Sequence, residues 1–295
     1  MVSQAAAVSD CAAELDRIDL SLSSLDDAGG AEAATRQAYL RLRRARLSGV
    51  LDDLRRADTA VSAALRRYPD WPDLSYLRAS TDLDLHRPGA ALALLDSVAG
   101  EAGSSPACLE LRGAALEQLG QRERAEDCFA RALSADPSWQ ALAGLAQLRA
   151  AAGDDRAADA LYARAEDELT AKQMSTFAWV RLARGALAAG SGDHGTAWAH
   201  YRSADVAFSG YWLTESHIAA LLRRENRLDE AASAYAAVRA RTARPDLAEA
   251  LGDVHRLRGD DRESARWYAI ALAEYQDSAA RGEALYLHHL ARNER

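Results

Sequence analysis

Apolar residues recur through most of the chain with the spacing of amphipathic helices, and short polar segments containing Gly or Asn interrupt them. Residues 106–136 show the pattern in full, because two such apolar runs flank a polar turn that begins at Gly120. Small residues at Gly113 and Ala125 would let the two helices approach, and Phe129 would fill the space toward the next unit. This stretch therefore predicts a helix–turn–helix unit.

The same unit repeats along the chain. The small residue of the predicted second helix recurs at Ala57, Ala91, Ala125, Ala158, Ala197, Ala231 and Ala265, with spacings of 34, 34, 33, 39, 34 and 34 residues. Four residues later lie Val61, Leu95, Phe129, Tyr162, Tyr201, Tyr235 and Ala269. Alanine is common in this chain, but seven positions in register, mostly followed by a bulky apolar residue, indicate an internal repeat.

One unit carries the residues of a known repeat at fixed offsets: Leu109, Arg112, Gly113, Leu116, Ala125, Phe129, Ala132 and Pro137. This set resembles the 34-residue tetratricopeptide repeat, and the resemblance covers roughly residues 36–275. It implies an all-α, right-handed α-solenoid of about seven helix–turn–helix repeats. The outer units match least well, since Arg41, Arg44 and Ala269 replace bulky apolar or aromatic residues, as expected of capping repeats.

Three segments are expected along the chain. Residues 1–30 are predicted to form an N-terminal covering helix, residues 31–275 the solenoid, and residues 276–295 a C-terminal covering helix. The single spacing of 39 predicts a change in the phase of the stack near residues 166–176. A bend, a longer helix or a soft boundary would each accommodate the extra residues.

Composition narrows the classes of partner and the cellular compartments that are expected. A net charge of −8 argues against general nucleic-acid binding, which needs a dominant basic face. Arginine outnumbers lysine by 35 to 1, which indicates a GC-rich, bacterial-like coding bias. The three cysteines have no metal-binding spacing, which favours a reducing compartment, and Cys108 and Cys128 are expected to be small core residues. No signal peptide or membrane-spanning run is visible, so we expect a cytoplasmic protein unless an export signal has been removed.

No catalytic or cofactor motif is present. The sequence lacks a phosphate-binding loop, a dinucleotide-binding glycine pattern, a zinc-protease motif and a nucleophile elbow. The adjacent residues His288 and His289 would point in different directions on a helix. We therefore expect no metal, no cofactor and no enzymatic activity.

The resemblance also implies a binding face, because the first helix of each tetratricopeptide unit lines the concave surface. The offsets used for ligand contact fall on Tyr76, Ser80, Glu110, Glu117, Gln118, Gln140, Gln147, Trp179, His217, Arg223, Arg224, Glu249, Asp253 and Arg256. These side chains either contact a partner or are solvated. The Lys/Asn pattern with which chaperone-binding members hold a C-terminal carboxylate is missing, which disfavours a chaperone adaptor.

Two patches stand out from the rest of the sequence. Residues 177–212 contain seven aromatic residues, which form either a platform for a peptide or packing between repeats. Residues 31–70 contain nine arginines and five acidic residues, a local net charge of +4 against −12 for the rest of the chain. This arginine patch is either a docking site for an acidic partner or a solvated helix face.

The predicted function is a non-catalytic scaffold or adaptor that holds a protein or peptide in the concave groove. It would bind neither nucleic acid nor membrane and would be a monomer or a homodimer. Two alternatives stay open. One is a sensor that changes superhelical pitch on binding a short peptide, and the other is an enzyme, or an obligatory partner of one, whose residues converge from different repeats.

Overall fold

The computed structural model describes residues 9–25, 29–98 and 103–293. Helices make up most of this described part of the chain, and it contains no strand. The helices are α1 (Asp10–Ser23), α2 (Ala31–Ser48), α3 (Leu51–Arg67), α4 (Pro72–Asp84), α5 (Pro88–Ser97), α7 (Pro106–Gln118), α8 (Arg122–Ala135), α9 (Trp139–Ala151), α10 (Asp155–Asp167), α11 (Met174–Gly190), α12 (His194–Ala207), α13 (Trp212–Arg224), α14 (Leu228–Thr242), α15 (Pro245–Leu257), α16 (Asp261–Ala280) and α17 (Leu287–Asn293).

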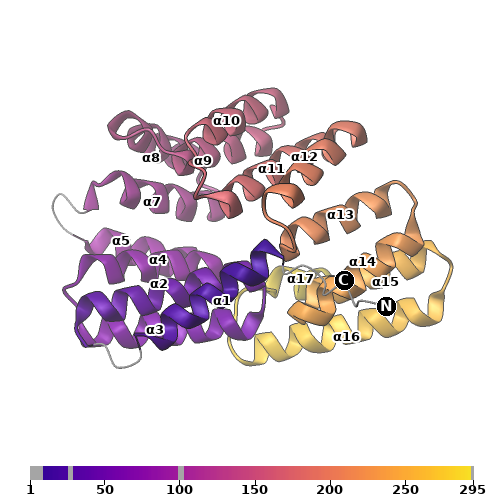
Figure 1. Ribbon diagram of the computed structural model, residues 1–295, viewed down its shortest axis with the longest axis horizontal. Coiled ribbons are helices and arrows are strands. Elements are labelled where there is room, and N and C mark those ends of the chain that lie inside the picture. The colour runs from indigo at the N-terminus through magenta and orange to yellow at the C-terminus, as the bar shows by residue number, and fades with distance from the viewer. Residues whose placement is uncertain (1–8, 26–28, 99–102, 294–295) are drawn as a thin grey trace, which may run out of the picture.

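Consecutive helices pack as seven pairs, and each pair packs on the next. The pairs are α2–α3, α4–α5, α7–α8, α9–α10, α11–α12, α13–α14 and α15–α16. They follow one another around a curved path that rises from α2–α3 to α8–α10 and descends to α15–α16 (Figure 1). The structure is thus an all-α solenoid built from helix–turn–helix repeats.

Local signals in the sequence set the ends of the helices. The side chain of Ser9 accepts a hydrogen bond from the backbone N of Ala12 and caps α1. Asp154, Asp193 and Asp260 cap α10, α12 and α16 in the same way. Asn226 has a φ of 60° in the turn before α14, as the predicted left-handed helix ends require.

The repeated alanines form the centre of each pair. The first six, from Ala57 to Ala231, have no exposed surface. Phe129 lies between Gly113 and Gly144, and a Cβ atom on either glycine would come within 3 Å of its ring. Small residues therefore face large ones at these helix crossings, which lets neighbouring backbones approach.

The register predicted for the last repeat is wrong by one residue. Ala265 and Ala269 are exposed, whereas Ser264 is buried and donates a hydrogen bond of 3.0 Å to the backbone O of Gly252. Tyr268, not Ala269, holds the aromatic position, since its ring lies against Gly252. The spacing from Ala231 is therefore one residue shorter than the alanine pattern suggested, because serine replaces alanine at the small position.

The irregular spacing lengthens one helix. The α11 helix contains 17 residues, whereas α9 and α13 contain 13 each. Of the outcomes considered for the extra residues, the structure has the longer helix, which follows the connection at residues 168–173.

The first and last repeats meet. The indole Nε1 of Trp212 donates a hydrogen bond of 3.1 Å to the backbone O of Arg46. Arg55 of α3 forms a two-point ion pair with Glu283, at 2.6 and 3.0 Å. Leu51 joins the apolar cluster of α15 and α16. The solenoid therefore closes on itself, with α16 beside α3 (Figure 1).

The two terminal helices lie near this closure. Helix α1 buries Ile18 and Leu22 with side chains of α2, and the carboxylate of Asp10 accepts hydrogen bonds from Ser209, at the turn before α13. Helix α17 places the His289 Nδ1 atom 2.7 Å from the Glu249 carboxylate. Helix α16 continues past residue 275 to Ala280. The division at residues 1–30, 31–275 and 276–295 stays a prediction.

All three cysteines are core residues, as predicted for Cys108 and Cys128. Cys11, Cys108 and Cys128 are buried thiols without disulfides. Burial raises the pKa of Cys11 to about 11, so its thiol stays protonated at neutral pH.

Candidate binding site

Where the ends of the solenoid meet lies a partly open cavity of about 450 Å³, which we call the inner cavity. It is lined by Ala45, Arg46, Gly49, Val50, Leu51, Leu54, Leu83, Asp84, His86, Gln118, Trp179, Tyr211, Trp212, Leu213, Arg244 and Leu285. These residues come from α2, α3, α4, α7, α11 and α13 and from the segments that join the helices. The first helices of several repeats therefore contribute to this cavity. The volume falls in the range of ligand sites.

Arg46 lies at the end of α2 and extends into this cavity. Its Nε atom donates a hydrogen bond of 2.7 Å to Asp84, and its Nη2 atom donates one of 2.8 Å to Ser80. Half of its side chain remains exposed. Asp84 orients the guanidinium, and although burial by itself lowers the pKa of Arg46, the charge of this carboxylate holds it above its usual value.

Arg244 approaches the same cavity from the connection between α14 and α15. Its guanidinium lies 4.6 Å from the centre of the Trp212 ring, and its Nε atom is 3.1 Å from Asp246. This stacking on an aromatic face restricts the guanidinium to one plane. Its terminal nitrogens donate no hydrogen bond to any residue that the structure describes, so they can receive an acceptor from a ligand.

The aromatic part of the wall is formed by Trp179, Tyr211 and Trp212. Trp179 packs edge-on against Trp139 and Tyr162, with ring centroids 6.1 and 6.4 Å apart. Burial raises the pKa of Tyr211 to about 12, so this hydroxyl is neutral. The cavity thus combines two cations with rigid aromatic surface, the side chains that most often dominate binding energy.

Of the predicted site residues, two line the inner cavity. They are Gln118, whose Nε2 atom donates a hydrogen bond to the backbone O of Leu83, and Trp179. Ser80 is buried beside the cavity as an acceptor for Arg46. Tyr76 is half-buried on the same helix, and its pKa is raised by burial and by the charge of Glu110.

Two predicted acidic residues are held by the protein itself. Glu110 is buried and accepts a hydrogen bond from Ser138, while Glu249 accepts one of 2.7 Å from Tyr275 and contacts His289. Burial raises the pKa of Glu110 and also that of half-buried Glu117. These positions contribute to packing between repeats.

The predicted residues of the last repeats do not reach the inner cavity. Arg223 and Arg256 both contact Asp253, which also accepts a hydrogen bond of 2.5 Å from Tyr268. Arg224 donates to the backbone O of Ala189. These contacts connect neighbouring helices.

Three further predicted residues lie away from the cavity lining. The ring of His217 lies 5.6 Å from that of Tyr201, and burial lowers the pKa of His217 to about 4, so it is neutral at pH 7. Gln140 is exposed at the start of α9, and Gln147 is half-buried further along that helix.

Sequence reasoning missed Arg46, Asp84, Trp212 and Arg244 as members of one site. Trp212 was noted within the aromatic segment and Arg46 within the arginine patch, but nothing local links them. Their contact joins residues 166 positions apart. The aromatic segment does not form a single platform, because Tyr201 and Phe208 are buried in the core, whereas Trp179, Tyr211 and Trp212 line the cavity.

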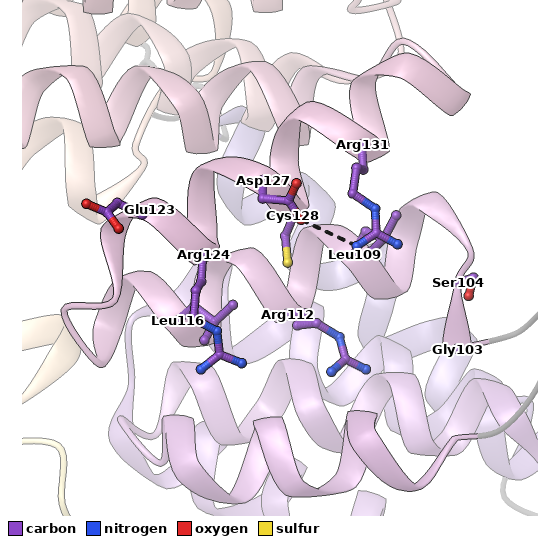
Figure 2. Close-up of a pocket in the computed structure, with 10 residues that line it drawn as sticks. All are labelled: Gly103, Ser104, Leu109, Arg112, Leu116, Glu123, Arg124, Asp127, Cys128 and Arg131. Carbon is purple, nitrogen blue, oxygen red and sulfur yellow. Dashed lines mark hydrogen bonds and ion pairs between the residues drawn. The ribbon is translucent and has the colours of Figure 1, made fainter.

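Two open grooves lie between paired helices. The α7–α8 groove, of about 550 Å³, contains Arg112, Arg124 and Arg131 together with Glu123 and Asp127 (Figure 2). Its arginines are engaged: Arg112 pairs with Asp96, Arg124 bonds Gln121, and Arg131 lies 3.4 Å from Asp127.

The α2–α3 groove has a different lining. It measures about 570 Å³ and is lined by Ala34, Gln37, Ala38, Arg41, Arg55, Arg56, Thr59, Ala60, Ala63, Ala64 and Arg67. Four of these residues are arginines and none is acidic. It therefore contains part of the arginine patch noted in the sequence.

Neither a metal cluster nor a membrane span is found in the described part of the chain. No group of three or more His, Cys, Asp or Glu residues is placed to hold a metal ion within it. Among the same residues, no helix is both long and apolar enough to cross a membrane.

Sequence comparisons identify no relative: no protein-family profile matches the chain, and no curated protein does either. Solved structures are similar in fold. The Cut9–Hcn1 hetero-tetramer of the APC/C matches with a TM-score of 0.67 and 14% identity, over 94% of this chain and 59% of that one. A tetratricopeptide repeat protein from Parabacteroides merdae matches with a TM-score of 0.57 and 15% identity, over 84% and 92%.

A third match is TTC0263, a thermophilic tetratricopeptide protein of Thermus thermophilus. It has a TM-score of 0.56 and 18% identity, over 65% of this chain and 99% of that one. The protein therefore has the tetratricopeptide-repeat fold, an all-α solenoid of helical repeats. It spans less than two thirds of the Cut9–Hcn1 chain that it matches.

Proposed function

We propose that the protein is a non-catalytic scaffold that binds an acidic segment of a protein or peptide partner in the inner cavity. One observation carries this proposal: Arg46 and Arg244 present guanidinium groups to the same cavity as Trp179 and Trp212. The similar structures supply only the fold, a scaffold type that commonly serves protein interaction.

The charges and surfaces of the cavity favour an extended acidic segment. A carboxylate can accept two parallel hydrogen bonds from one guanidinium, and Arg244 is held in a plane by Trp212. The neighbouring apolar residues Leu83 and Leu213 and the ring of Trp179 would cover the aliphatic parts of the segment. A cavity of about 450 Å³ suits a short stretch of peptide and not a folded domain.

One observation also favours the sensor alternative. Arg46 belongs to the first helix pair and Arg244 to the connection before the last, so one ligand would contact both ends of the solenoid. A ligand that binds the closed arrangement more tightly than an open one shifts the protein toward closure. Binding and a change in shape would then be two readouts of one site.

The test is calorimetric titration of the full chain with a short peptide in which Glu alternates with Leu, beside the same peptide with Gln for Glu. The Glu peptide should bind, and Arg244→Gln should weaken it about tenfold, a loss of ~1.4 kcal/mol. The matched control is Arg131→Gln, which removes one guanidinium from the α7–α8 groove. Equal binding of the two peptides, or equal losses in the two variants, would contradict the proposal.

A further inference from the structure

The first helix pair has a second open face, opposite the face that packs against the rest of the solenoid. On α3, Asp58 and Ser62 contact Arg78 of α4. Ala60 and Ala63 lie about 100–160° away around the same helix, at 100° per residue, and line the α2–α3 groove. The groove therefore faces away from α4.

Each repeat packs its second helix on the first helix of the next repeat: α3 on α4, α8 on α9, and α14 on α15. Helix α1 packs in the same way on α2 and reaches the turn at Ser209, and Asp19 of α1 pairs with Arg44 beside the groove. The lining of the α2–α3 groove consists only of residues of α2 and α3, so no other described helix covers it.

The lining fits a helix of one particular composition. Five alanines form the floor, and small side chains at a helix contact permit a short interaxial distance. Arg41, Arg55, Arg56 and Arg67 surround this floor. Neither Arg41 nor Arg67 forms an ion pair with a described residue, and the side chain of Arg56 is 69% exposed although it lies 3.5 Å from Asp53.

Comparison with the α7–α8 groove shows that cationic character is particular to this site. Both grooves have three or more arginines and similar volumes, but Glu123 and Asp127 are part of the α7–α8 lining. In the α2–α3 groove Arg55 pairs with Asp52 and Glu283, which are not part of the lining, whereas Arg41 and Arg67 form no ion pair with a described residue and lie beside an apolar floor. Its lining includes no aromatic side chain on which a nucleic-acid base could stack.

We propose that the α2–α3 groove is a docking site for an amphipathic helix of a partner protein, with small or aliphatic residues on one face and Asp or Glu along its flanks. The aliphatic face would pack on the alanine floor, and the carboxylates would pair with the surrounding arginines. Because this groove is separate from the inner cavity, the two sites can be occupied by different segments.

The test uses a fluorescein-labelled 20-residue helical peptide with an Ala/Leu stripe flanked by Glu, and its Gln counterpart, in fluorescence anisotropy with the full chain. The Glu peptide should bind, and more weakly as salt is raised. R41E/R67E should weaken binding at least tenfold, whereas the matched reversal R124E/R131E in the α7–α8 groove should leave it within twofold. A63W, which fills the groove at an exposed position, should also abolish binding without changing any charge.

Circular dichroism establishes that each variant is folded, and A63W keeps the test valid if charge reversal disturbs α2 or α3. R244Q distinguishes the two sites. If R244Q removes binding of the helical peptide, that peptide binds in the inner cavity. This result would overturn the groove proposal and leave the proposed function intact. Unchanged binding to R41E/R67E and A63W would also overturn it. So would self-association in sedimentation that R41E/R67E abolishes, or displacement of the helix by a single-stranded oligonucleotide.

Discussion

The inner cavity and the α2–α3 groove both present arginines, but the protein holds those arginines in different ways. In the cavity, Asp84 orients Arg46 and the Trp212 ring supports Arg244, so each guanidinium is fixed before a ligand arrives. In the groove, Arg41 and Arg67 extend over alanines without a carboxylate partner among the described residues. Preorganised cations favour specific contacts, whereas mobile ones favour attraction at longer range.

The two sites also differ in what creates them. The groove requires only α2 and α3, which are adjacent in the chain. The cavity requires the first repeat to meet the last two, through contacts such as that of Trp212, in the sixth repeat, with Arg46. A change that opens the solenoid should therefore abolish the cavity and spare the groove.

The largest effect is expected from Gly49→Ala. Gly49 has a φ of 68°, and an added Cβ would lie 2.6 Å from the Trp212 ring. Backbone strain and overpacking together should lower the free energy of unfolding by about 2–4 kcal/mol and weaken peptide binding in the cavity. Urea denaturation measures the loss of stability. Titration with the acidic peptide and with the helical peptide measures binding to the cavity and to the groove.

Gly120→Ala is the matched control for that change. Gly120 has a similar φ of 74°, but nothing lies within 4 Å of the added Cβ. It should lose only about 1–2 kcal/mol and keep both binding activities. Equal losses in the two variants would mean that Trp212 does not press on Gly49.

Acid should open the cavity before it affects the groove. The hydrogen bonds from Arg55 lower the pKa of Glu283 from 4.5 to about 2. Between these two pKa values Glu283 binds a proton in the unfolded chain but not in the folded one. The stabilisation is therefore complete above pH 4.5 and is lost as the pH falls toward 2. We expect the ion pair to contribute about 1–3 kcal/mol to the free energy of unfolding at neutral pH, because Glu283 is partly exposed and solvent weakens the pair.

The measurement is stability between pH 6 and pH 2.5 for the native chain and for Glu283→Gln. The substitution should lower stability at pH 6 and flatten the slope below pH 4.5. A slope that does not change would show that the ion pair contributes nothing to closure.

Much of the fold could be predicted because packing within a repeat is local. Ala57, Ala91 and Ala125 are fully buried at the predicted interval, and Phe129 fills the predicted space. The last repeat was misaligned because a small residue, not alanine itself, is what the position requires, and Ser264 meets that need.

The site was predicted less well for a physical reason. Trp179 and Gln118 were found because repeat offsets identify side chains on the first helix of a pair. Arg244 lies between helices, and its position in the cavity depends on curvature summed over all the repeats. The same curvature leaves Asp253 and Arg256 outside the cavity lining, where they contact one another.

Among the variants expected to weaken binding in the cavity, Trp179→Ala should have the smallest effect on binding. Its ring packs against Trp139 and Tyr162 but is only half-buried, so the chain should keep its helical circular-dichroism signal at 25 °C and lose about 2 kcal/mol of stability. The acidic peptide should bind the cavity a few-fold more weakly, while the helix probe binds the groove as before. A loss of helix binding as well would show that the sites are coupled.

The most direct test of the closed solenoid is a double-mutant cycle on Arg55 and Glu283, which lie 228 positions apart in the chain. Urea unfolding would be measured for the native chain, Arg55→Ala, Glu283→Ala and the double variant. If the solenoid is closed, we expect a coupling energy of about 1 kcal/mol or more, because the ion pair is bidentate and partly buried. Additive effects, with no coupling, would contradict the contact between the first and last repeats and with it the inner cavity.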